Sequence, residues 1–168
     1  MLNLTYSFDN EGQTATKTDP LGTTQYQWDA RGRLTSASLP SGQTVSYGYD
    51  ALGRRSSRAA LGNTTKFLYD GSDVVLDQSS GSPVEYLNAP AVDAKLKQSD
   101  GGGSIYFLPD HLGSTTALTD SNGVVVERLQ YEPYGQSSGS TRTRYDYTGR
   151  ERDQLTGMIF YRARWYDP

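Results

Sequence analysis

A repeat of about twenty residues in the first seventy positions constrains this chain more than any other feature of its sequence. Four segments share the order aromatic, any residue, aromatic, Asp, at residues 6–9, 26–29, 47–50 and 67–70, and they begin 20, 21 and 20 residues apart. Glycines follow three residues after the first three aspartates and again midway between repeats. A fixed period of this length predicts a repeat architecture, in which each unit packs against its neighbours in the chain.

Each repeat has the pattern of two β-strands and two turns. Before each aspartate the aromatic residues alternate with other residues, as at Tyr47 and Tyr49, which is typical of a strand with one buried face. The aspartate then stands first and a glycine fourth, the places that these residues prefer in a type I turn. A second turn, with proline second and glycine fourth at residues 19–22 and 39–42, returns the chain. We therefore predict an all-β fold, an antiparallel meander of hairpins that forms a curved or spiral sheet.

Two sets of residues carry this prediction. The first set should form the repeat turns: Asp9, Gly12, Asp29, Gly32, Asp50, Gly53, Asp120 and Gly123. The second should form the structural core: Tyr26, Trp28, Tyr47, Tyr49, Phe67, Tyr69, Tyr161 and Trp165. A catalytic acid is needed once or twice and not once per repeat, so turn formation is the preferred role of the aspartates. Cross-strand stacking is likewise preferred for the aromatic residues over a ligand-binding platform.

The composition excludes several classes of function. The 168 residues include 13 tyrosines, 18 glycines and 7 prolines, which suits a β protein with many turns. There is no cysteine, and this excludes disulfides, thiolate zinc sites and cysteine nucleophiles. The net charge is −3 and no block of basic residues occurs, so a nucleic acid partner is not expected. No apolar run is long enough to span a membrane.

The sequence gives little support for a catalytic site or a metal site. His111 is the only histidine, and a Ser/His/Asp triad would have to combine it with neighbours such as Asp110 and Ser114. No nucleophile elbow accompanies them, so we favour a structural role for His111. The repeated turns lack the carboxylate density of a calcium loop, and no pair of carboxylates stands out for glycoside hydrolysis. We predict no cofactor, no metal site and no catalytic residue, and the sequence identifies no ligand-binding residue.

The second half of the chain contains further strand signals. Val124, Val125 and Val126 follow another turn of the repeat type. Residues 158–166 alternate over their whole length and predict one closing strand, with Ile159, Tyr161, Ala163 and Trp165 on its buried face. Arg162 and Arg164 on the other face could pair with carboxylates or stack on aromatic rings. Residues 78–83, 98–104 and 136–143 are rich in Gly and Ser and predict loops.

Several of these segments resemble a known family. Residues 26–34 (YQWDARGRL) and 47–55 (YGYDALGRR) are similar to the YD repeat of Rhs proteins. Residues 110–114 (DHLGS), 117–120 (ALTD), 131–135 (YEPYG), 147–151 (YTGRE) and 160–168 (FYRARWYDP) resemble the Rhs-repeat-associated core, in the order of that family. The resemblance implies last YD repeats at residues 1–76, an irregular connecting segment at 77–104 and a core-like β region at 105–168.

In this family the repeats wind into a hollow β-sheet shell that encloses a C-terminal segment, often a toxin, which is released by self-cleavage. The resemblance therefore implies a non-enzymatic structural segment of an exported bacterial protein, secreted or at the cell surface. The family's cleavage aspartates lie in a second Asp-Pro segment beyond the one that ends this chain, so Asp167 is interpreted as structural. We expect this chain to be a piece of a longer protein, truncated before that segment.

The expected partners are other YD repeats of a longer shell or an enclosed polypeptide. A short strip of sheet also has two open edges with unpaired backbone groups, so the isolated chain could associate with itself. An alternative function is a carbohydrate- or cell-surface-binding module that uses exposed Tyr and Trp side chains. Exposure of both Trp28 and Trp165 on one open face would favour this alternative.

Overall fold

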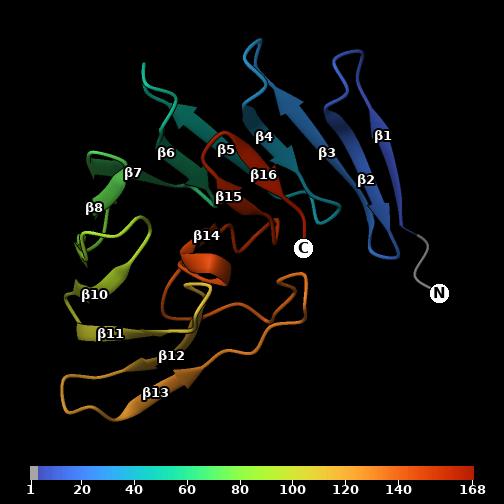
Figure 1. The fold of residues 1–168 in the computed structure, drawn as a ribbon. Coiled ribbons are helices and arrows are strands. Elements are labelled where there is room, and N and C mark those ends of the chain that lie inside the picture. Colours follow the sequence, from blue (N-terminus) through green and yellow to red (C-terminus); the bar gives the residue numbers. More distant parts are fainter. Residues whose placement is uncertain (1–3) are drawn as a thin grey trace. The chain divides into compact units, whose positions relative to one another are not determined.

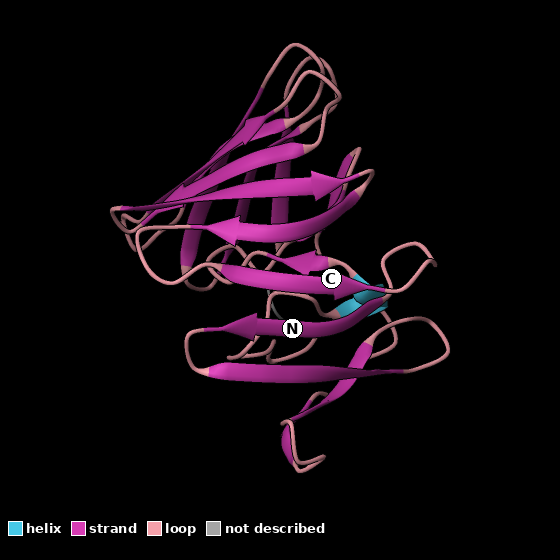
Figure 2. Ribbon diagram, turned by 90° about the vertical axis from the view of Figure 1, so that its left-hand side faces the viewer, coloured by secondary structure: helices cyan, strands magenta, loops and turns pink. Residues whose placement is uncertain are grey.

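The computed structural model describes residues 4–168, and strands make up almost all of its regular structure (Figures 1 and 2). Thirteen strands form one sheet in which hydrogen-bonded neighbours follow the order of the sequence. Each recorded pairing between them is antiparallel, so the predicted meander is confirmed. Among the described residues the sheet is not closed, because β1 and β13 stand at its two ends.

The strands of this sheet are β1 (Thr5–Phe8), β2 (Thr14–Asp19), β3 (Gly22–Trp28), β4 (Leu34–Ser38), β5 (Thr44–Tyr49), β6 (Arg55–Ala60), β7 (Asn63–Asp70), β8 (Asp73–Gln78), β9 (Val84–Asn88), β10 (Lys95–Asp100), β11 (Gly103–Pro109), β12 (Thr115–Thr119) and β13 (Val125–Arg128). A second sheet contains β14 (Glu151–Arg152), β15 (Ile159–Tyr161) and β16 (Arg164–Tyr166), and the 3₁₀ turn η1 (Tyr147–Gly149) precedes it. The chain divides into two compact units, Met1–Thr65 and Lys66–Pro168.

In the first unit a single row of side chains crosses four strands. Tyr26 pairs with Ala37, Ala37 with Val45, and Val45 with Ala60, so one position on each of β3 to β6 lines up. All four residues are buried. Large and small side chains alternate along the row, which lets neighbouring strands pack closely on this face.

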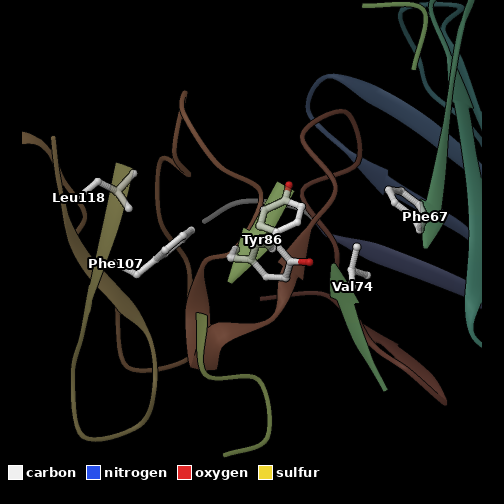
Figure 3. Close-up of a cluster of buried hydrophobic side chains, with 6 residues drawn as sticks. Phe67, Val74, Tyr86, Phe107 and Leu118 are labelled. Atoms are coloured by element: carbon white, nitrogen blue, oxygen red, sulfur yellow. The ribbon is translucent and has the colours of Figure 1, made fainter. Parts of the chain in front are cut away.

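In the second unit one buried residue from each of five strands forms a hydrophobic cluster. Figure 3 shows Phe67 of β7, Val74 of β8, Tyr86 of β9, Phe107 of β11 and Leu118 of β12. Tyr145, which lies between β13 and η1, belongs to the same cluster and meets Tyr86 edge to face at 5.1 Å between ring centroids. The segment after β13 therefore packs on the buried face of the strands that precede it.

Two expectations about the second half are corrected. Residues 77–104 are not irregular, because β9 and β10 continue the meander and a two-residue turn, Gly101 and Gly102, joins β10 to β11. The Gly/Ser-rich composition of residues 98–104 reflects that tight turn and not a loop. The domain boundaries proposed at 76/77 and 104/105 stay predictions.

The single closing strand predicted over residues 158–166 is also wrong. Arg162 has a φ of 58°, and the chain turns there so that β15 pairs antiparallel with β16. Ala163, expected on the buried face, is exposed, whereas Met158 and Phe160 from the opposite set are buried. The alternation of residue types in the sequence continues through the turn, so this pattern could not reveal that the chain reverses its direction there.

Candidate functional site

Five turns of the meander are built by one aspartate each. In every case the aspartate Oδ1 accepts hydrogen bonds from the backbone N–H groups of the residues two and four positions later. The residue three positions later is a glycine with a positive φ, and its backbone N–H donates to the backbone carbonyl of the aspartate. These aspartates are Asp9, Asp29, Asp50, Asp110 and Asp120. One oxygen of each carboxylate is thus bound within its own turn, which is the structural role that the repeat pattern favours.

Arginine strengthens two of these turns. Arg33 Nε donates to Asp29 Oδ2 and Arg54 Nε donates to Asp50 Oδ2, each at 2.7 Å. The hydrogen bond from Arg33 lowers the pKa of Asp29 below its usual value. Arg33 also lies over the ring of Tyr49, 4.7 Å from its centroid, so it links one repeat to the aromatic residue of the next.

The register of the strand pair shifts before each of these turns, as at a β-bulge, and at three of them an aromatic side chain from later in the chain caps the bulge. Trp28 Nε1 donates to Thr14 O, Tyr49 Oη to Leu34 O, and Tyr131 Oη to Thr115 O, at 2.8, 2.8 and 2.6 Å. Each accepting carbonyl lies opposite a bulge, on the residue that pairs with the bulged position. Thr14 pairs with Phe8, Leu34 with Trp28, and Thr115 with Pro109. A bulge interrupts the ladder of hydrogen bonds, and the later side chain supplies a donor there.

Removing one such donor tests this arrangement. We expect Tyr49→Phe to lower the free energy of unfolding by about 1–2 kcal/mol, because the carbonyl of Leu34, a residue with 0% exposure, loses its side-chain donor. Urea denaturation followed by circular dichroism measures the change. Tyr106→Phe, at an exposed position of β11, is the matched control and should change stability by less than about 0.5 kcal/mol. An equal effect of both substitutions would contradict the capping role.

Arg144 is the centre of a polar network on the buried face of the second unit. Its Nη2 donates to Asp77 Oδ1 at 2.9 Å, its Nη1 contacts Asp77 Oδ2, and its Nε donates to Glu151 Oε2 at 2.7 Å. Nη1 and Nη2 also reach the hydroxyls of Tyr86 and Tyr145. The guanidinium lies 4.8 Å from the ring centroid of Phe67 and so joins the hydrophobic cluster to the two carboxylates.

Lys95 is buried beside this network. Its Nζ donates to Val74 O at 3.0 Å and to Asn88 Oδ1, and it lies 4.4 Å from the ring centroid of Tyr145. Val74 pairs with Tyr69 at the bulge of β7, so Lys95 and Asn88 cap this bulge as Trp28, Tyr49 and Tyr131 cap three others. Burial lowers the pKa of Lys95 to about 8, against the opposite effect of nearby carboxylates such as Glu151.

This lowered pKa predicts a gain in stability at alkaline pH. Between pH 8 and 10.5 the folded chain has lost the Lys95 proton while the unfolded chain still holds it, so unfolding takes up a proton and rising pH favours the folded state. From pH 7.5 to 9.5 we expect the free energy of unfolding to rise by roughly 2 kcal/mol at most. Above about pH 10 the trend should reverse, because burial raises the pKa of Tyr86.

Denaturation midpoints at the two pH values measure the effect. Lys95→Met keeps the length of the side chain without a titrating group, so its stability should change little over the same interval. A rise of equal size in this variant would contradict the assignment to Lys95.

Two more arginines of the C-terminal segment hold Asp93, in the connection between β9 and β10. Arg150 Nη2 lies 2.8 Å from Asp93 Oδ2, and Arg162 Nη2 lies 2.8 Å from Asp93 Oδ1. Burial raises the pKa of Asp93, and the two arginines act against that rise. Arg162 therefore pairs with a carboxylate, one of the two roles proposed for it, whereas Arg164 is exposed.

Arg152 joins the loops of the C-terminal segment to one another. Its Nη2 donates to Gly135 O at 2.8 Å, its Nη1 to Gly157 O at 3.0 Å, and its Nε to the carboxylate of Asp146. Asp146 is 1% exposed. A buried carboxylate held by a buried guanidinium fixes these loops without regular secondary structure.

The eight residues predicted to form the core differ in how far their side chains are buried. Tyr26, Tyr47 and Phe67 are buried, whereas the other five are half-buried: Trp28, Tyr49, Tyr69, Tyr161 and Trp165. Trp28 donates from its indole to Thr14 O, and Trp165 packs against Phe160 at 5.1 Å between centroids. Both tryptophans are engaged within the chain, so these positions do not support the binding-module alternative.

No enzymatic constellation forms around His111, whose side chain is exposed. Asp110 Oδ1 is bound to two backbone N–H groups, and Ser114 Oγ accepts from Thr148 N. Within residues 4–168 no group of three or more His, Asp or Glu side chains could hold a metal ion. Over the same range no helix is long and apolar enough to cross a membrane.

The residues of the buried network were not found from the sequence. Arg144 and Asp77 are 67 positions apart, and no local pattern links them. Lys95 could not be found from the local pattern either, because alternation over residues 95–98 (KLKQ) would bury Leu96, whereas the structure exposes Leu96 and buries Lys95.

Comparison with known proteins places this geometry in a family. The Teneurin YD-shell family matches residues 1–168. The chain is 27% identical over 173 residues to the tRNA3(Ser)-specific nuclease WapA of Bacillus spizizenii, covering 96% of this chain and 7% of WapA. It is 29% identical over 158 residues to Teneurin-3 of Mus musculus, covering 87% of this chain and 6% of that protein.

Solved structures show the same fold. The Photorhabdus luminescens Tc holotoxin pore aligns with a TM-score of 0.66 at 17% identity, over 98% of this chain and 11% of the matched chain. The chain thus spans less than an eighth of each of these relatives. Because the family match extends over its whole length, the chain belongs to the Teneurin YD-shell family, and its resemblance to Rhs and YD-repeat proteins is confirmed.

Proposed function

We propose that this chain is a non-enzymatic wall segment of an exported bacterial YD-repeat shell that encloses and delivers a C-terminal toxin. One observation carries the proposal: the family match covers every residue of a meander whose strands follow the sequence without a crossover. A wall built in this way can be extended at either end by further repeats. Its location would be secreted or at the cell surface, as part of the longer protein.

The relatives support separate roles for the β-sheet wall and for the toxin segment of such proteins. WapA is named a nuclease, yet this chain corresponds to only 7% of its length. Asp29, Asp50 and Asp77 are engaged in turns and an ion pair, and the proposal assigns nuclease chemistry to other parts of such proteins. The partners would be neighbouring YD repeats, through the edges of β1 and β13, and the enclosed polypeptide.

A chimera tests the proposal. The matched segment of Bacillus spizizenii WapA is replaced by this chain, and the protease resistance of the C-terminal nuclease segment is followed by mass spectrometry. We expect the resistance of the parent protein to be kept. A β domain of equal length from an unrelated fold serves as the control and should expose the nuclease segment. Loss of protection in a chimera that retains the β-sheet signal of the parent would overturn the proposal.

A further inference from the structure

A polar cavity of about 370 Å³ lies within the second unit, on the side of β10 to β13 that faces residues 141–142. The charged residues of its lining are Asp100, Asp120 and Arg142. Ile105 and Val126 supply an aliphatic wall. Cavities of this size bind small molecules when a few polar groups converge on an apolar wall.

Gln98 adds an unmet hydrogen bond to this lining. The residue is 6% exposed, and its Nε2 donates to Arg142 O at 2.9 Å. Its Oε1 is buried and has no hydrogen-bond partner among the described residues. A buried acceptor without a donor is costly, and a bound water or ligand hydroxyl is the usual way to satisfy it.

The charges of the cavity narrow the class of ligand. Asp100 and Asp120 repel an anion such as phosphate, and Arg142 offsets part of their attraction for a guanidinium or ammonium group. A neutral polyhydroxyl compound uses both kinds of group, because each hydroxyl can donate to a carboxylate or amide oxygen and accept from a guanidinium. We infer that this cavity is a subsite for a neutral saccharide. This goes beyond the proposed shell role, which requires no small ligand.

The two isoleucines of the chain provide a direct readout. Ile105 lines the cavity, whereas Ile159 is 0% exposed and lies in β15. In the full chain with ¹³C-labelled isoleucine methyl groups, methyl α-glucoside or methyl α-galactoside should shift the Ile105 signal saturably and leave the Ile159 signal in place. Inorganic phosphate and agmatine, the anionic and cationic probes, should leave both signals unchanged.

Substitutions identify the groups that bind. Asp120→Asn keeps the oxygen that accepts from Asn122 N and Val124 N, and Arg142→Ala removes an exposed side chain, so both variants should fold. Each should weaken saccharide binding roughly tenfold, which is the loss of about 1.4 kcal/mol. Arg31→Ala, an exposed arginine of the first unit, is the control and should bind as the parent does.

Two outcomes would overturn the inference. If neither glycoside shifts the Ile105 methyl signal at about 50 mM, the cavity holds water only. A shift produced by phosphate or agmatine, with the glycosides silent, would assign the cavity to a charged ligand. Neither result would affect the shell proposal, because the chimera does not depend on this cavity.

Discussion

Replacing Arg144 by alanine should destabilise the second unit by about 3–5 kcal/mol, because it leaves two buried carboxylates without their cation. Asp77 and Glu151 are each 8% exposed, and Arg144 bonds to both. The substitution also removes the guanidinium from the ring of Phe67. Urea denaturation measures the loss, and amide hydrogen exchange should show it concentrated in residues 66–168.

Two further variants separate charge from packing. Arg144→Lys restores the charge but not the fork of donors that reaches Asp77 and Glu151 together, so it should recover less than half of the loss. Adding Asp77→Asn to Arg144→Ala removes one of the two unpaired buried charges and should recover part of the lost stability. Arg164→Ala, at an exposed position of β16, should change stability by less than about 0.5 kcal/mol. An effect of Arg144→Ala no larger than this control would show that the network does not stabilise the fold.

The repeating half of the chain was predictable because its forces are local. An aspartate that bonds backbone groups two and four residues later, followed by a glycine with positive φ, closes a hairpin without help from distant residues. Turns of this kind, at a twenty-residue period, determine a meander whose strands pair with their neighbours in sequence. The fold class therefore followed from residues such as Asp29 and Gly32.

The C-terminal half was less predictable because its order depends on long-range contacts. Arg144 meets Asp77 across 67 positions, and Arg162 meets Asp93 across 69. The same dependence explains the error at residues 158–166, where a positive φ at Arg162, beside its ion pair with Asp93, accompanies the reversal of the chain. The capping of bulge carbonyls was missed as well, although the second aromatic of these repeats, Trp28 or Tyr49, can donate a hydrogen bond where phenylalanine could not.

Gly149→Ala should be as damaging as the loss of Arg144, for a steric reason. Gly149 is buried in η1 with a φ of 69°, and a Cβ there would lie 2.7 Å from the carbonyl oxygen of Asp93 and 3.2 Å from that of Gly113. Both contacts are with backbone atoms, which cannot rotate away as a side chain can. We expect a loss of about 3 kcal/mol or more, measured by thermal or urea denaturation.

Gly157→Ala separates this clash from the cost of the backbone conformation. Gly157 has a nearly identical φ of 73°, but nothing lies within 4 Å of a Cβ at this position. Its substitution should therefore cost only the strain of a left-handed alanine, about 1–2 kcal/mol. The difference between the two variants measures how tightly η1 is held against the β9–β10 and β11–β12 connections. Equal losses would mean that η1 can move away from Asp93 and Gly113, and that the contacts around Asp93 do not hold the C-terminal segment in place.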